Sequence, residues 1–148
     1  MKSSFRTLAA YVVAGLALAA RAADDLKAMT GTWKPTRAEF GGQPMPSPVL
    51  KTITLKIDGA NYEVTVDSEQ AKGRVDKGTV AVDRNTQPKG MTITGVDGPN
   101  AGKTFLAIYE FTGDTLRVCY DLSGADRPTE FKTAPETKLY LVVYERSK

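Results

Sequence analysis

The residue types of this chain narrow its chemistry before any motif is considered. Its 148 residues include no histidine and a single cysteine. Nucleophilic catalysis through a histidine is therefore excluded, as are nearly all zinc, copper and haem sites. Cys119 lies in an apolar segment, where we expect a buried small hydrophobe rather than a reactive thiol. An enzyme would have to rely on carboxylates, lysines, tyrosines or a cofactor. The sequence itself predicts no catalytic residue, no metal site and no cofactor.

One segment comes close to a phosphate-binding loop. The stretch GPNAGKT at 98–104 ends in the Gly-Lys-Thr of that motif, but Asp97 stands where its first glycine belongs. A phosphate-binding loop also opens a helix, whereas the apolar strand-like run TFLAIYEF follows here. We therefore expect a hairpin turn. The acidic residues are scattered, form no calcium loop and fall mostly at strand ends, although a glycosidase-type carboxylate pair stays open.

The first 22 residues are typical of a secretory signal peptide. Lys2 and Arg6 precede the apolar run LAAYVVAGLAL, and Ala20 and Ala22 supply the small residues of a cleavage site. The alternative is a membrane anchor, but the run is short for a bilayer span. We expect an exported protein, periplasmic or secreted, that keeps no membrane span after cleavage.

Removal of this leader changes the charge of the chain. The chain has 20 Lys and Arg against 17 Asp and Glu, and the leader holds three of the basic residues and no acid. The domain at 23–148 is therefore formally neutral, with 17 residues of each sign. This balance offers no electrostatic basis for binding nucleic acid.

Beyond the leader, the apolar residues recur with the period of strands. Residues Asp24 to Met29 are typical of a short helical turn, after which period-two segments alternate with Gly- and Pro-containing turns. The expected strands are 32–40, 50–58, 61–67, 77–83, 90–96, 104–111, 115–121 and 138–146. Such a series predicts an all-β fold, either a sandwich or an eight-stranded antiparallel up-and-down barrel, and closure removes exposed edges. We predict the barrel.

Two hairpins fix the register of four of these strands. A turn after Asp58 places Ile57 opposite Tyr62, with Leu55 and Ile53 opposite Val64 and Val66 on the same face. A turn at 113–114 likewise brings Phe111, Tyr109 and Ala107 opposite Leu116, Val118 and Tyr120. The aromatic residues of these apolar faces could line a ligand pocket or simply fill the core; they are Tyr62, Tyr109, Phe111 and Tyr120.

Charged residues near the last hairpin allow two interpretations each. Glu110 falls opposite Arg117, as an exposed ion pair or as a polar ligand contact inside the barrel. In the long connection at 122–137, Arg127 could select a polar ligand at the barrel mouth or cap strand ends. Phe131 could plug the barrel. A loop of this length is often functional.

The start of the first strand resembles a known signature. Gly31-x-Trp33 after a helical turn is similar to the G-x-W motif of the lipocalins, which implies that Trp33 closes one end of the barrel. Arg146 in the last strand corresponds to the arginine that packs across this ring in that family. The stretches GTWKPTRAEFGGQPMP, DGPNAGKTFLAIYEFTGDTLRVCYD and RPTEF further resemble small exported bacterial lipocalin-like domains of unestablished function.

The resemblance implies a barrel and passes on no catalytic residue. We expect a non-enzymatic exported domain that binds a small apolar or amphipathic ligand in the barrel or at its mouth. The contacts would come from Tyr62, Tyr109, Phe111, Tyr120 and Arg127. The alternative is a filled barrel that binds a protein partner or acts as an inhibitor through its loops.

Overall fold

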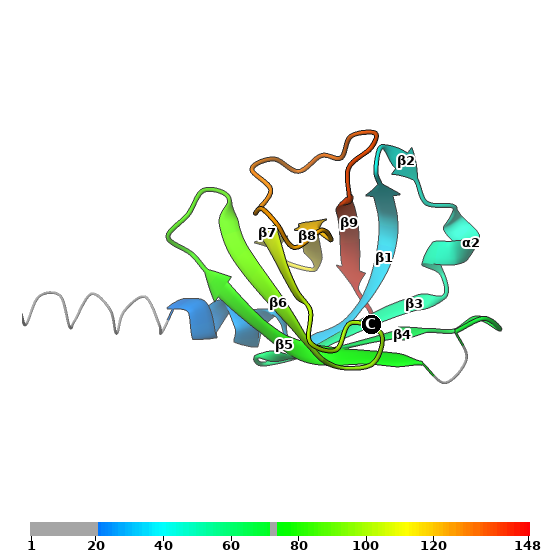
Figure 1. Ribbon diagram of the computed structural model, residues 1–148. Helices are drawn as coiled ribbons and strands as arrows, with labels where there is room; N and C mark the ends of the chain where they lie inside the picture. Colours follow the sequence, from blue (N-terminus) through cyan, green and yellow to red (C-terminus); the bar gives the residue numbers. More distant parts are fainter. Residues whose placement is uncertain (1–20, 72–73) are drawn as a thin grey trace, which may run out of the picture.

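A single sheet closed on itself forms the protein (Figure 1). The computed structural model describes residues 21–71 and 74–148. Over this part of the chain the barrel strands follow in sequence order, and each pairs antiparallel with the next. They are β1 (Gly31–Phe40), β3 (Ile53–Asp58), β4 (Asn61–Val66), β5 (Val75–Asp83), β6 (Lys89–Asp97), β7 (Thr104–Thr112), β8 (Thr115–Asp121) and β9 (Leu139–Arg146). Pairing of β1 with β9 completes the predicted eight-stranded barrel, which is compatible with a lipocalin-like fold.

The first strand bends so that it can pair with both of its neighbours. Its start, Gly31 to Trp33, pairs with β3, while β9 follows it from Trp33 to Phe40. The register with β9 shifts between Pro35 and Arg37. A bulge of this kind admits an extra residue and tolerates a proline. The side chains that face inward are therefore those of Trp33 and Pro35 before the bulge and that of Ala38 after it, and all three are buried.

Both predicted hairpin registers are confirmed. In β3 and β4, Ile57 lies opposite Tyr62 and Leu55 opposite Val64. In β7 and β8, Tyr109 lies opposite Val118 and Phe111 opposite Leu116. Because side chains alternate across a strand, these registers direct one apolar set from four strands into the barrel.

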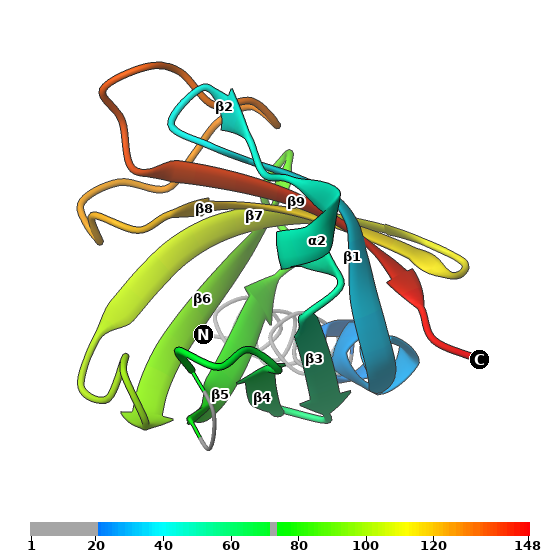
Figure 2. The same cartoon turned by 90° about the vertical axis from the view of Figure 1, so that its right-hand side faces the viewer.

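The strand predicted from residue 50 begins later, at Ile53. The short helix α2 (Ser47–Leu50) and the two-residue strand β2 (Gln43–Pro44) occupy the preceding segment, beside β1 in Figure 2. Pro46 and Pro48 account for the difference, because a proline near a helix start supplies a fixed helical φ and cannot donate within a sheet. Leu50 is buried by this turn.

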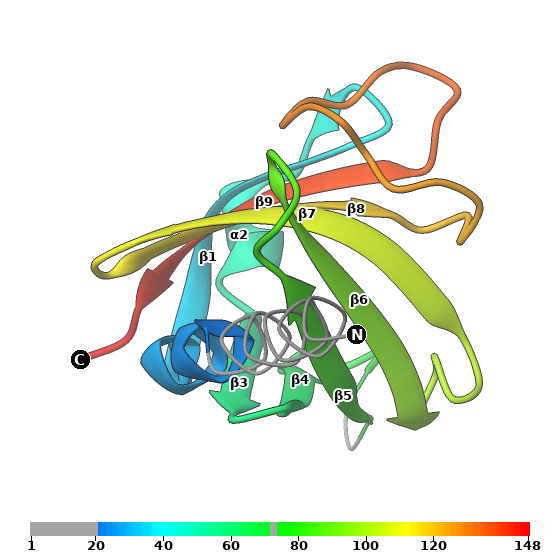
Figure 3. The same ribbon diagram turned by 90° about the vertical axis from the view of Figure 1, so that its left-hand side faces the viewer.

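The described chain also begins in a helix. Residues 21–29 are helical and contain the predicted turn at 24–29; Figure 3 shows them at the end of the barrel where β1 starts. The predicted signal peptide lies outside the described residues except for its last two, so its cleavage stays a prediction. No helix in the described ranges is long and apolar enough to cross a bilayer.

The long connection between β8 and β9 packs on the outside of the barrel. Cys119 is fully buried there, its thiol 3.6 Å from the Lys132 carbonyl oxygen, and burial raises its pKa. The ring of Phe131 lies 4.0 Å from the Arg117 guanidinium. Arg117 is on the outward face of β8 and pairs with Glu110 at 2.6 Å, with both side chains substantially exposed. Phe131 therefore covers the outer surface and does not plug the barrel, and the Glu110–Arg117 pair is not inside it.

Two charged residues anchor this connection. The Asp121 carboxylate accepts hydrogen bonds from the Ser123 hydroxyl at 2.6 Å and from the Asp126 backbone at 3.0 Å. Burial is the largest influence on the Asp121 pKa and raises it, but the hydrogen bonds together outweigh burial and lower the pKa. Arg127 donates to the carbonyl oxygens of Met91 and Ala107 at 2.7 and 2.8 Å. It rests on Gly90, where a Cβ would lie 3.2 Å from the guanidinium.

Replacing Arg127 by methionine is expected to lower the free energy of unfolding by about 2 kcal/mol, because two carbonyl groups lose a charged donor. Urea unfolding measures this change, and limited proteolysis should cut the variant earlier within 122–138. Lys132→Met is the control, since that side chain is exposed on the same connection. Equal stability of the two variants would show that Arg127 is not an anchor.

Candidate ligand-binding site

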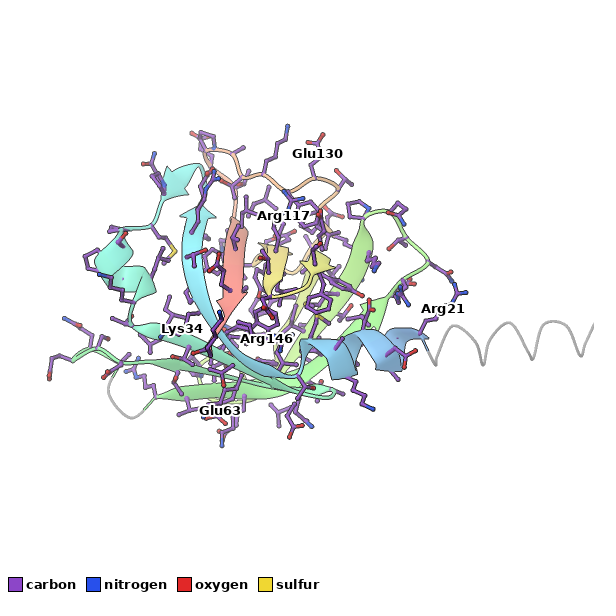
Figure 4. The ribbon with its side chains drawn as sticks, turned by 180° about the vertical axis from the view of Figure 1, so that it is seen from behind. Arg21, Lys34, Glu63, Arg117, Glu130 and Arg146 are labelled. Atoms are coloured by element: carbon purple, nitrogen blue, oxygen red, sulfur yellow. The ribbon has the colours of Figure 1, made fainter. Side chains whose placement is uncertain are left out.

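One end of the barrel is closed around Trp33. Its side chain is fully buried, and its indole nitrogen donates to the Met29 carbonyl oxygen at 2.8 Å. The Arg146 guanidinium lies 4.4 Å from the indole ring, as the resemblance implied. Figure 4 shows Arg146 beside the start of β1. A Cβ at Gly31 would lie 2.7 Å from this guanidinium, which explains the glycine two residues before the tryptophan.

Arg146 also ties the N-terminal helix to the barrel. It donates to the carbonyl oxygens of Thr30 at 2.9 Å and Ala28 at 2.8 Å, and pairs with Asp114 in the β7–β8 turn at 3.1 Å. The helix end, the indole and the turn are thereby held as one unit.

Two of the predicted ligand contacts belong to this closed end. The Tyr109 hydroxyl donates to Asp25 at 2.6 Å, and the same carboxylate pairs with Arg84 and Lys89. Phe111 meets Trp33 edge to face, with ring centroids 6.1 Å apart. Both side chains consolidate the packing around the indole, and neither lines the cavity described next.

Beyond this packed end, the interior of the barrel contains a cavity of about 300 Å³. This is at the small end of the range for ligand sites, and about twice the volume of an engineered cavity that holds benzene. Of the predicted ligand contacts, Tyr62 and Tyr120 line it, whereas Arg127 does not. Most other lining residues are aliphatic and come from β3 to β8, among them Leu55, Val64, Val80, Met91, Ile93 and Val118.

Tyrosines supply part of the polar lining. The hydroxyls of Tyr120 and Tyr144 lie 3.1 Å apart, and Tyr140 stacks on Tyr120 with ring centroids 5.7 Å apart. Tyr140 and Tyr144 were not predicted as site residues. Tyr140, Val142 and Tyr144 are spaced two residues apart in the last strand, so they share one face of it. This spacing could have identified both tyrosines from the sequence.

A second polar group lies on β5 and the β6–β7 turn. The Asp76 carboxylate accepts from the Tyr62 hydroxyl at 3.1 Å, from the Asn100 side chain at 3.1 Å and from the Asn100 backbone at 3.2 Å. All three residues line the cavity. Asp76 and Asn100 were not predicted as site residues, because the expected strand began at 77 and the turn was expected only to connect strands.

Glycines make this second group possible. A Cβ at Gly78 would lie 2.7 Å from the Tyr62 ring, and a Cβ at Gly95 would lie 1.9 Å from the Asn100 carbonyl oxygen. Gly98 has φ +95° and would press a Cβ against the Val75 carbonyl oxygen at 2.2 Å. The segment that nearly matches a phosphate-binding loop is therefore a hairpin turn, as predicted. Its glycines allow the close packing of backbone segments.

Burial raises the pKa of every described tyrosine, with Asp76 adding to the effect on Tyr62 and Asp25 to that on Tyr109. The residues are Tyr62, Tyr109, Tyr120, Tyr140 and Tyr144. Because each pKa in the folded state lies above its unfolded value, this contribution to stability is complete below about pH 10. It is lost as the pH rises further.

We expect these tyrosines to ionise only as the barrel unfolds. In an alkaline titration of residues 23–148, tyrosinate absorbance should rise in one cooperative step that coincides with loss of the circular dichroism signal. In denaturant the same groups should titrate near pH 10. A gradual absorbance rise near pH 10 with the fold intact would contradict the burial of these rings.

Comparison of the chain with protein-family models, with curated proteins and with solved structures gave no significant match. The class of the protein therefore comes from the architecture: a closed antiparallel eight-stranded barrel, compatible with a lipocalin-like fold.

Proposed function

We propose that this protein is an exported, non-enzymatic lipocalin-like domain that holds a small apolar or amphipathic ligand inside its barrel. The observation that carries the proposal is the cavity of about 300 Å³, lined by aliphatic side chains and tyrosines and set above a packed floor. A mostly apolar cavity with a few convergent polar groups is typical of small-molecule sites.

The same cavity argues against the filled barrel that the protein-interaction or inhibitor hypothesis required. The non-enzymatic character rests on the residue types of the sequence, which holds no histidine and a single cysteine. Membership of the small exported lipocalin-like domains is supported by the placement of Gly31, Trp33 and Arg146. Export itself is supported by the leader sequence alone.

Native mass spectrometry of the protein purified from its own host tests ligand carriage. We expect a second population, heavier than the mature chain by the mass of one small molecule, that collapses to the bare chain when the protein is denatured. A single unliganded population that co-purifies with another protein would instead favour the interaction hypothesis. Cleavage after Ala22 would be read from the same spectrum.

A further inference from the structure

The charge in the cavity lining is negative. Asp76 is its only charged side chain, and no lysine or arginine among the described residues lines it. Asp76 faces inward because it alternates with the exposed Lys77 and lies two residues before the buried Gly78 and four before the buried Val80. Its carboxylate is half-buried and its hydrogen-bond donors, Tyr62 and Asn100, are both neutral. The carboxylate is therefore held by neutral donors, and no ion pair to it is formed within residues 21–71 and 74–148.

The carboxylate is also held in place and retains room for another donor. One of its oxygens accepts from Tyr62 and the Asn100 side chain, while the other accepts only from the Asn100 backbone. A carboxylate oxygen can accept two hydrogen bonds, so the second oxygen has an acceptor position left. The close approaches at Gly78, Gly95 and Gly98 fix the donors and hence the direction of the carboxylate.

The aromatic lining favours the same kind of ligand. Tyr62, Tyr120, Tyr140 and Tyr144 and the ring of Phe105 contribute to the wall of the cavity. Aromatic faces attract ammonium groups, and the attraction grows when the group is removed from water. An anionic head group would instead face the negative charge of Asp76 and the π-faces of these rings.

The basic side chains of the described residues lie outside the cavity. Lys103 and Lys138 are exposed and border an adjoining surface groove, which shares Asn100, Phe105 and Leu122 with the cavity lining. Exposed lysines of this kind stay solvated and interact weakly with a ligand group in water.

We infer that the ligand of this cavity is an organic amine in its protonated form, with an apolar body larger than benzene. The ammonium group donates to Asp76 and lies against tyrosine rings, while the body contacts the aliphatic lining. This inference rests on the proposed function, whose ligand class it narrows.

Three probes of equal chain length test it: octylamine, octanol and octanoate, titrated at neutral pH by isothermal calorimetry. We expect octylamine to bind about tenfold more tightly than octanol, because both can donate to the Asp76 carboxylate but only the ammonium group adds the attraction between opposite charges and the attraction to the aromatic faces. Octanoate should bind most weakly. Octanol or octanoate binding as tightly as the amine would overturn the inference and leave ligand carriage standing, whereas no binding by any probe would overturn both.

The variant Asp76→Asn isolates the charge. It keeps the shape and an acceptor oxygen, so the preference for octylamine over octanol should fall to near parity while octanol affinity changes little. A purely structural role of Asp76 would weaken both probes equally. Asp97→Asn is the control, because that acid is exposed next to the same turn and does not line the cavity. If Asp76→Asn retains the amine preference, the inference is wrong; the wild-type series decides it even if the variant fails to fold.

Discussion

Replacement of Trp33 by alanine is expected to lower the free energy of unfolding by about 3–5 kcal/mol. The side chain is fully buried, its N–H bonds to Met29, and Arg146 and Phe111 pack against its ring. Loss of the indole leaves a void beneath the cavity and a guanidinium without its aromatic contact. Because whole domains are stable by only about 5–15 kcal/mol, the variant should be close to unfolding at ambient temperature.

Urea unfolding followed by circular dichroism measures this effect, since the variant has lost the only tryptophan. Trp33→Phe is the matched comparison: it keeps an aromatic ring but loses the bond to Met29, so it should lie between the wild type and Trp33→Ala. Phe111→Ala should cost less, because Phe111 is only partly buried. A cost for Trp33→Ala below about 1 kcal/mol would contradict the role of the indole as the floor of the barrel.

The second large effect concerns ligand binding. Val64→Phe is expected to weaken binding at least about thirtyfold, because a ligand would have to displace a ring at a cost of about 2 kcal/mol. Val64 lines the cavity and is only partly buried, so the new ring has space to enter. For the same reason, the free energy of unfolding should stay within about 1 kcal/mol of the wild type.

Fluorescence titration with N-phenyl-1-naphthylamine, an uncharged probe of apolar pockets, measures this loss independently of the head-group inference. Thr65→Phe supplies the control, since Thr65 neighbours Val64 on β4 and points to the opposite face. That variant should bind the probe as the wild type does. If both variants bind equally well, the probe does not occupy the barrel interior.

Much of the fold could be predicted because it depends on local alternation. A strand places every second side chain on one face, so the apolar pattern located the strands, and the short turns after Asp58 and Thr112 set two registers. The floor of the barrel was anticipated from the resemblance to the G-x-W signature, and the pairing of β1 with β9 then brings Trp33 and Arg146 together. The segment at 47–50 was missed because its prolines favour a helical turn over the alternation around them.

What sequence alone determined is thus which residues face inward; how deep each lies along the barrel axis was decided by the tertiary structure. Tyr62 and Tyr109 are both inward aromatics, yet Tyr62 reaches the cavity and Tyr109 packs at the closed end. Arg127 and Phe131 lie outside because their connection folds back over β7 and β8 through contacts distant in sequence. The contact between Asp76 and Asn100 likewise depends on two glycines that are distant from one or both of these residues in sequence. A Cβ at Gly95 or Gly98 would lie about 2 Å from a backbone carbonyl oxygen, so no other residue allows this close packing. A cavity is the difference between the volume a closed sheet encloses and the volume its side chains fill, so no local pattern contains it.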